Sequence, residues 1–210
     1  MKLSSILTKI FMAMTGLLWF GFLVGHLVGN TLLFRGAEKF DAYGAFLHST
    51  GGLLYLTEVG LIIFLSIHIF SGLRTWRINR KARPSRYAVS ASEGEASWFS
   101  RTMVFGGLLL GVFIVTHVYW FRIATPEGAS LFQRVVETFQ NPLTVAWYVL
   151  ALVFLGMHLS HGLASAFQTL GLLKPHWRPK LKMAGTVVGW LIALGFMSMP
   201  LCAWLGTITA

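Results

Sequence analysis

The sequence predicts an all-α integral membrane protein with a bundle of five transmembrane helices. Hydrophobic residues make up 55% of the 210 residues and charged residues only 11%, which is not the composition of a soluble domain. A spanning helix needs roughly 20 mostly apolar residues. Long charge-free stretches meet this length at 10–34, 102–121, 138–173 and 183–210, and the stretch 59–73 meets it when extended back through Glu58 to Gly52.

The helices are predicted in order from these stretches and their flanking residues, at about 5–34, 52–77, 98–123, 142–170 and 180–204, within one membrane domain that covers 1–210. Asn141 and Pro142 form a typical N-cap and first-turn pair for the fourth helix. The first stretch is too long for the apolar part of a signal peptide and is expected to remain in the mature chain.

Lys and Arg in the short connections predict the orientation. They concentrate before the first helix, between the second and third, and between the fourth and fifth; the opposite connections hold only Arg35, Lys39, Arg122 and Arg134. The positive-inside rule therefore places the N-terminus in the cytoplasm and the C-terminus outside. Membrane topology explains the net charge of +10 without nucleic-acid binding, although such a basic face could also bind a soluble acidic partner.

Five of the seven histidines lie inside predicted spans, where ionisable side chains are costly and indicate function. His26 and His117 precede the outer ends of their helices by at most about eight residues, so both lie in the outer half of the membrane. By the same reasoning His68 and His158 lie in the inner half. The four residues form two pairs, each matched in depth.

Two imidazoles at one depth on different helices are the arrangement that bis-histidine haem ligation requires. Cys202 is the only cysteine, so a covalent attachment is excluded and haem b is expected. No carboxylate or thiolate completes either pair, which disfavours a bare metal ion. Glycines close to these histidines in sequence would leave space for a porphyrin between the helices, but they are also typical of ordinary helix packing. They are Gly21, Gly25, Gly29, Gly72, Gly111 and Gly162.

Haem propionates are anionic, and arginines flanking the spans could bind them. Arg35 and Arg122 are candidates on the outer side, and Arg74 and Arg77 on the inner side. Each of the four is equally well explained as positive charge at a helix end.

The ordered words GHLVGN and RGAEKFDAYGAF (25–46), IHIFSGL (67–73), THVYWFR (116–122) and HLSHGL (158–163) resemble a known family. It is the diheme cytochrome b membrane anchor of succinate:quinone oxidoreductases, which comprise succinate dehydrogenases and fumarate reductases. The likeness spans nearly the whole chain. The family pattern H-x-S-x-G-L matches His158, with His161 at a variable position; His161 could be the ligand instead, or touch the macrocycle or a propionate.

The resemblance implies two haem b groups, a distal one held by His26 and His117 and a proximal one held by His68 and His158. It implies a multi-pass subunit of the cell inner membrane that carries electrons between cytoplasmic partners and a membrane quinone, with menaquinone expected. Flavoprotein and iron–sulfur subunits would perform the dicarboxylate chemistry, since this chain has neither a dinucleotide fingerprint nor cluster-binding cysteines.

Quinone reduction consumes protons, so the quinone site needs an ionisable group. Near the distal haem, Glu58 is the first candidate, with His48 and Asp41 as further ones. Some diheme relatives carry a proton-conducting glutamate two residues before the fourth ligand, but Gly156 stands there in this chain. A proton path through this helix is therefore not expected.

Two other classes of protein fit part of the pattern. A proton-coupled transporter could line a pathway with histidines, but broken helices or repeated halves are not evident in the sequence. The cytochrome b anchor of another quinone-linked dehydrogenase could also hold two haems. Haem content would distinguish a transporter from a diheme anchor of a succinate:quinone oxidoreductase. The co-purifying subunits would distinguish the anchor of another dehydrogenase from it.

Overall fold

The computed structural model describes residues 4–82, 98–126, 128–172 and 174–208. Five of the helices in these ranges are long and apolar enough to cross a membrane. They are α1 (Ser5–Asn30), α3 (Gly52–Lys81), α4 (Trp98–Val118), α6 (Pro142–Thr169) and α7 (Arg178–Trp204). The predicted all-α membrane fold with five spanning helices is confirmed.

Two spanning segments change helix type near the outer ends that the sequence predicts. The segment expected to run to 34 leaves the α-helix after Asn30 and continues as the 3-10 helix η1 (Thr31–Arg35). The third segment continues beyond Val118 as the π-helical turn η2 (Tyr119–Ile123). α3 extends past the predicted end at 77 to Lys81, and the polar linker predicted at 80–97 lies mostly outside the described residues.

Two short helices lie where the sequence analysis expected only connections, α2 (Ala37–Ser49) and α5 (Leu131–Thr138). α5 buries Phe132, Val135 and Val136, the spacing of one helix face. α2 is flanked by Gly36 and Gly51, whose φ angles of 88° and 53° allow the sharp turns into and out of this helix. Both helices are too short to span a bilayer.

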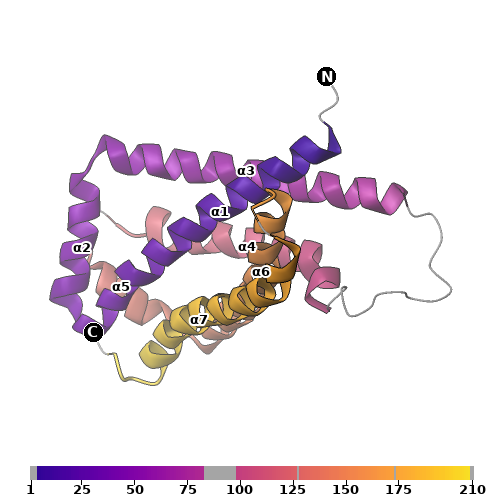
Figure 1. Cartoon of the computed structure of the whole chain (residues 1–210). Helices are drawn as coiled ribbons and strands as arrows, with labels where there is room; N and C mark the ends of the chain where they lie inside the picture. Colours follow the sequence, from indigo (N-terminus) through magenta and orange to yellow (C-terminus); the bar gives the residue numbers. More distant parts are fainter. Residues whose placement is uncertain (1–3, 83–97, 127, 173, 209–210) are drawn as a thin grey trace.

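Successive long helices run in opposite directions. One end of the bundle holds the start of α1 beside the end of α3, since Ser5 and Lys9 share a pocket with Thr75 and Asn79. We call it the N-terminal end. The other end holds α2, α5, η1 and η2, and we call it the capped end; Figure 1 shows α2 turned across the direction of α3 there, near the C-terminus.

The capped end contains the larger apolar core. Side chains of α2, α5, α6 and α7 form this core with Leu33, which is 1% exposed. The most apolar stretch of α3, by contrast, has no buried residue. α3 packs chiefly on α1, and α6 chiefly on α7. The bundle is therefore tight along α6 and α7 and open along α3.

Candidate functional site

Four histidines from four different helices meet in two pairs. The rings of His26 on α1 and His117 on α4 have their centres 5.8 Å apart, with an interplanar angle of 85°. The rings of His68 on α3 and His158 on α6 have their centres 6.1 Å apart, at 64°. The structure thus brings together the histidines that the sequence placed at equal depths.

The two pairs lie at different levels of the bundle. Tyr148 contacts His117, and His158 follows ten residues later on the same helix. At 1.5 Å per residue, this separates the levels by about 15 Å along α6. We call His26 and His117 the capped-end pair, and His68 and His158 the N-terminal-end pair.

The spacing within each pair fits a metal held between two imidazoles. With metal–nitrogen bonds of about 2 Å on each side, the ring centres would stand about 6 Å apart. In the described part of the chain, no three His, Cys, Asp or Glu side chains converge to hold an isolated metal ion. The iron of a haem brings its remaining ligands with it, so two imidazoles are enough to hold it.

The capped-end pair has polar neighbours and an aromatic surround. His117 Nδ1 lies 3.0 Å from the hydroxyl oxygen of Tyr148. Asn30 Nδ2 donates to the backbone oxygen of His26 at 2.7 Å and lies 3.2 Å from its Nδ1. Phe113 and Phe121 flank the His117 ring. These contacts restrict the orientation of both rings.

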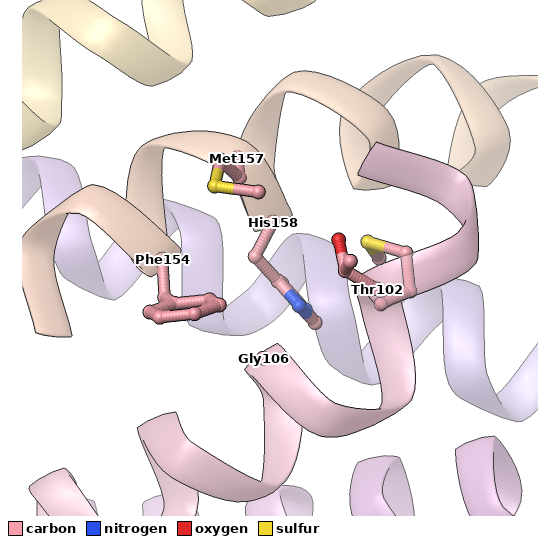
Figure 2. Close-up of a pocket in the computed structure, with 6 residues that line it drawn as sticks. Thr102, Gly106, Phe154, Met157 and His158 are labelled. Atoms are coloured by element: carbon pink, nitrogen blue, oxygen red, sulfur yellow. The ribbon is translucent and has the colours of Figure 1, made fainter. Parts of the chain in front are cut away.

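The N-terminal-end pair is less fully contacted. His68 Nδ1 lies 3.0 Å from the backbone oxygen of Met12 and can donate to it. His158 Nδ1 is buried and has no hydrogen-bond partner among the residues that the structure describes. Figure 2 shows His158 pointing from α6 toward α4 at Gly106, in a small cavity also lined by Phe154 and Met157. A buried polar atom without a partner is costly, and it suits a ring whose partner is not a protein atom.

Two glycines that the sequence analysis did not single out give the N-terminal-end pair its space. A Cβ at Gly16 would stand 3.0 Å from His68 Cε1, and one at Gly107 would stand 3.5 Å from His158 Cε1. Of the glycines named from the sequence, Gly29 approaches Tyr43, while Gly21 has nothing within 4 Å of such a Cβ. Proximity in sequence was therefore a poor guide to which glycines adjoin the rings.

His161 does not take part in either ring pair. It is half-buried on α6, within electrostatic range of Lys182 on α7. His158, not His161, faces His68. The geometry favours His158 as the partner of His68.

Glu58 and Arg122, to which the sequence analysis assigned different roles, are partners of each other. Arg122 Nε donates to Glu58 Oε1 at 2.6 Å, and Nη2 lies 3.4 Å from Oε2. The guanidinium also lies over the ring of Tyr55, 5.9 Å from its centre. About a third of each charged side chain is exposed, so this cluster on α3 and η2 opens to the surroundings at the capped end.

The remaining arginine candidates lie on helix surfaces. Arg35 is exposed at the end of η1, and Arg77 is exposed near the end of α3. Arg74 is half-buried one turn before Arg77. The structure places Arg35 at the capped end and the other two at the N-terminal end, on the same sides of the bundle as the pairs to which the sequence analysis assigned them.

Asp41 has a structural role that the sequence analysis did not foresee. Its Oδ2 accepts a hydrogen bond from Ser130 Oγ at 2.6 Å, and its Oδ1 accepts one from the backbone N–H of Phe132 at 2.9 Å. Asp41 thus ties α2 to the first turn of α5, a helix that was not predicted. His48, the other further candidate, is exposed at the end of α2.

Gly156 lies against α7. A Cβ there would stand 3.0 Å from Trp190 Cε3 and 3.2 Å from the Cβ of Ala193. A larger side chain at this position has no space. The glycine at this position therefore allows α6 and α7 to pack closely.

Sequence reasoning missed the side chains that contact the histidines from outside each pair. Asn30 follows His26 by four residues on one helix face, so its spacing was an available signal. Tyr148 lies on a different helix from His117. Only the tertiary structure brings these two together.

Comparison with known proteins gives two findings. Residues 76–197 match the family described as succinate dehydrogenase/fumarate reductase transmembrane subunit. The succinate dehydrogenase cytochrome b558 subunit of Bacillus subtilis (strain 168) is 28% identical over 154 residues, which cover 72% of each chain. No solved structure matches.

Proposed function

We propose a specific electron-transfer role for this chain, which belongs to the succinate dehydrogenase/fumarate reductase transmembrane subunit family and is a membrane cytochrome b subunit within it. In this role the chain is the inner-membrane anchor of a succinate:quinone oxidoreductase. Haem b, when bound, supplies one-electron transfer between the cytoplasmic partners and a membrane quinone. The residues of this chain hold the haems, orient them and bind the quinone.

The capped-end pair would hold one haem b and the N-terminal-end pair the other. Nδ1 of His117 and Nδ1 of His68 each face a protein oxygen, which leaves Nε2 of each ring for the iron. His26 and His158 complete the two pairs. The ring spacings of 5.8 and 6.1 Å, between residues about 90 positions apart in sequence, are the observation that carries this assignment.

Four arginines are candidates for binding haem propionates. Arg74 and Arg77 would serve the haem at the N-terminal end, and Arg35 the haem at the capped end. Arg122 already pairs with Glu58. It would have to share its guanidinium to bind a propionate as well, so we assign it first to Glu58.

The partners would be a flavoprotein and an iron–sulfur subunit that bind at the N-terminal end. Basic side chains from three helices gather there, including Lys9, Arg80, Lys81 and Lys182. A basic surface favours an acidic partner surface and speeds association. Under the positive-inside rule this end lies in the cytoplasm.

The quinone, with menaquinone as our proposal, would bind at the capped end beside Glu58. The carboxyl group of Glu58 can pass protons to a reduced quinone, and Arg122 keeps this group in place. His48 is exposed at the same end and is the second candidate for proton transfer. Asp41 is a weaker candidate than the sequence suggested, because both of its oxygens hold α5.

The test is to purify the complex from membranes and record reduced-minus-oxidised visible spectra with haem quantification. We expect two haem b per chain, together with co-purifying flavin and iron–sulfur subunits that reduce quinone with succinate. A complex without haem would overturn the proposal and favour a transporter. Two haems with other partner subunits would instead make the chain the anchor of a different quinone-linked dehydrogenase.

A further inference from the structure

We infer that Tyr148 is a positioning residue for His117. The hydroxyl oxygen of Tyr148 accepts a hydrogen bond from His117 Nδ1, and this bond lowers the reduction potential of the haem at the capped end. This inference rests on the proposed function, because it takes His26 and His117 as the residues that would hold the haem at the capped end. It concerns a residue that would act through a ligand rather than bind the iron itself.

The geometry is that of a fixed hydrogen bond. The Tyr148 oxygen lies 3.0 Å from His117 Nδ1, and Tyr148 is only 5% exposed. Its ring packs edge-on against Phe113 and Phe139, with centres 4.9 and 4.8 Å apart, and stacks on Trp120. Aromatic neighbours on several sides prevent the tyrosine from swinging away.

Ligation decides the direction of the bond. A neutral imidazole that binds iron through Nε2 carries its proton on Nδ1. Nδ1–H of His117 therefore donates, and the hydroxyl oxygen of Tyr148 accepts. An acceptor on Nδ1–H makes the imidazole a stronger electron donor to the metal, which stabilises oxidised iron and lowers the reduction potential.

The N-terminal-end pair provides an internal comparison. Within the described ranges His158 Nδ1 is buried without a partner, and His68 Nδ1 faces the backbone oxygen of Met12. The hydroxyl of Thr15 donates to the backbone oxygen of Phe11 at 2.7 Å and lies 3.4 Å from His68 Nδ1, farther from this nitrogen than the Met12 oxygen at 3.0 Å. A tyrosine hydroxyl is therefore a feature of the capped-end pair, and its removal should affect one haem selectively.

The position of Tyr148 on α6 adds a structural consequence. The same helix carries His158, which we assign as a ligand at the N-terminal end. α6 is thus a scaffold for both haem sites, through a ligand at one level and through a positioning residue at the other.

The test is a potentiometric titration of the whole complex carrying Tyr148→Phe, with EPR of the oxidised haems. Tyr119→Phe is the matched control, because Tyr119 is 54% exposed and has the same hydroxyl to lose. A His26→Ala complex, which should retain only the haem at the N-terminal end, identifies which potential belongs to which site.

We expect the Tyr148→Phe complex to retain both haems and the reduction potential of its capped-end haem to rise. The EPR signal of that haem should also shift, because this signal depends on the orientation of the two imidazole planes. The other potential and the control should match the wild type. Two retained haems with unchanged potentials would overturn the inference, as would an equal shift of both potentials. Absence of haem from the wild-type complex would instead overturn the proposed function.

A second substitution covers the case in which Tyr148→Phe fails to assemble. 3-Fluorotyrosine, inserted at position 148 alone, keeps the hydroxyl and nearly the same volume but makes its oxygen a weaker acceptor. We expect a smaller rise in the same potential. An unchanged potential in this protein would overturn the inference.

Discussion

The two ends of the bundle hold the same ligand pair in different surroundings. At the capped end, His26 and His117 lie among aromatic rings, and each of the two imidazoles has a polar side chain beside it. The core at this end is formed partly by α2 and α5. At the N-terminal end, His68 and His158 adjoin glycines, and the buried Nδ1 of His158 has no partner in the described part of the chain. Identical ligands in different surroundings are expected to give metal sites of different stability and potential.

The largest expected effect comes from removing a ligand at the N-terminal end. We expect His158→Ala to lose the haem at that end completely, and succinate-driven quinone reduction with it, while the capped-end haem remains. His161→Ala is the matched control, three residues away on the same helix, and should retain both haems. Haem quantification and reduced-minus-oxidised spectra measure this; loss of a haem in His161→Ala alone would reverse the assignment.

The next largest effect is expected from a substitution at the proposed quinone site of the capped end. We expect Glu58→Gln to lower the rate of quinone reduction by about 100-fold, the lower end of the usual effect of losing a proton-transfer group. Both haems, and succinate-driven reduction of a soluble dye by the partner subunits, should be unchanged. Glu137→Gln is the control, because Glu137 is exposed on α5. Equal quinone turnover in wild type and Glu58→Gln would remove Glu58 from the quinone site.

A change in the contact between α6 and α7 should affect both ends. A Cβ at Gly189 would stand 2.9 Å from the backbone nitrogen of Ser160 and 3.1 Å from the oxygen of Gly156. Because backbone cannot yield easily, Gly189→Ala should cost about 1–3 kcal/mol of stability. Gly52→Ala, where a Cβ meets nothing within 4 Å, is the control.

The measurement is the unfolding of the purified complex in detergent, followed through haem release from both sites. Both haems should be released at a lower denaturant concentration in Gly189→Ala. Haem release at the wild-type denaturant concentration would show that α6 and α7 can move apart without a loss of stability.

The smallest expected effect is a loss of haem stability at the capped end without a change at the N-terminal end. Asp41→Ala removes the acceptor for the Phe132 N–H at the start of α5, a loss of about 1 kcal/mol. We expect the capped-end haem to dissociate faster on heating, with the N-terminal-end haem unaffected. Glu38→Ala is the control, since Glu38 is exposed on the same helix. Equal loss of both haems would contradict a local role for the α2–α5 contact.

The sequence by itself was sufficient for the spanning helices and for the matched levels of the paired histidines along the bundle. Apolar length determines which segments can cross a bilayer, and the rise of a helix converts position in sequence into depth. Asn141 caps α6 as its residue type predicts, through Leu143 N at 2.9 Å. Each of these features depends on one segment and its solvent, so no knowledge of neighbouring helices was needed.

α2 and α5 were missed because short helices are stabilised by packing on the rest of the chain rather than by length. Contacts between helices likewise required the fold. Glu58 with Arg122 and Tyr148 with His117 join residues 64 and 31 positions apart, respectively. Helix rotation and crossing decide such pairs, and a hydropathy pattern that is apolar on nearly every face contains little information about rotation. The level of each histidine along the bundle could therefore be predicted from the sequence, whereas the neighbours of each side chain at that level were decided by tertiary packing.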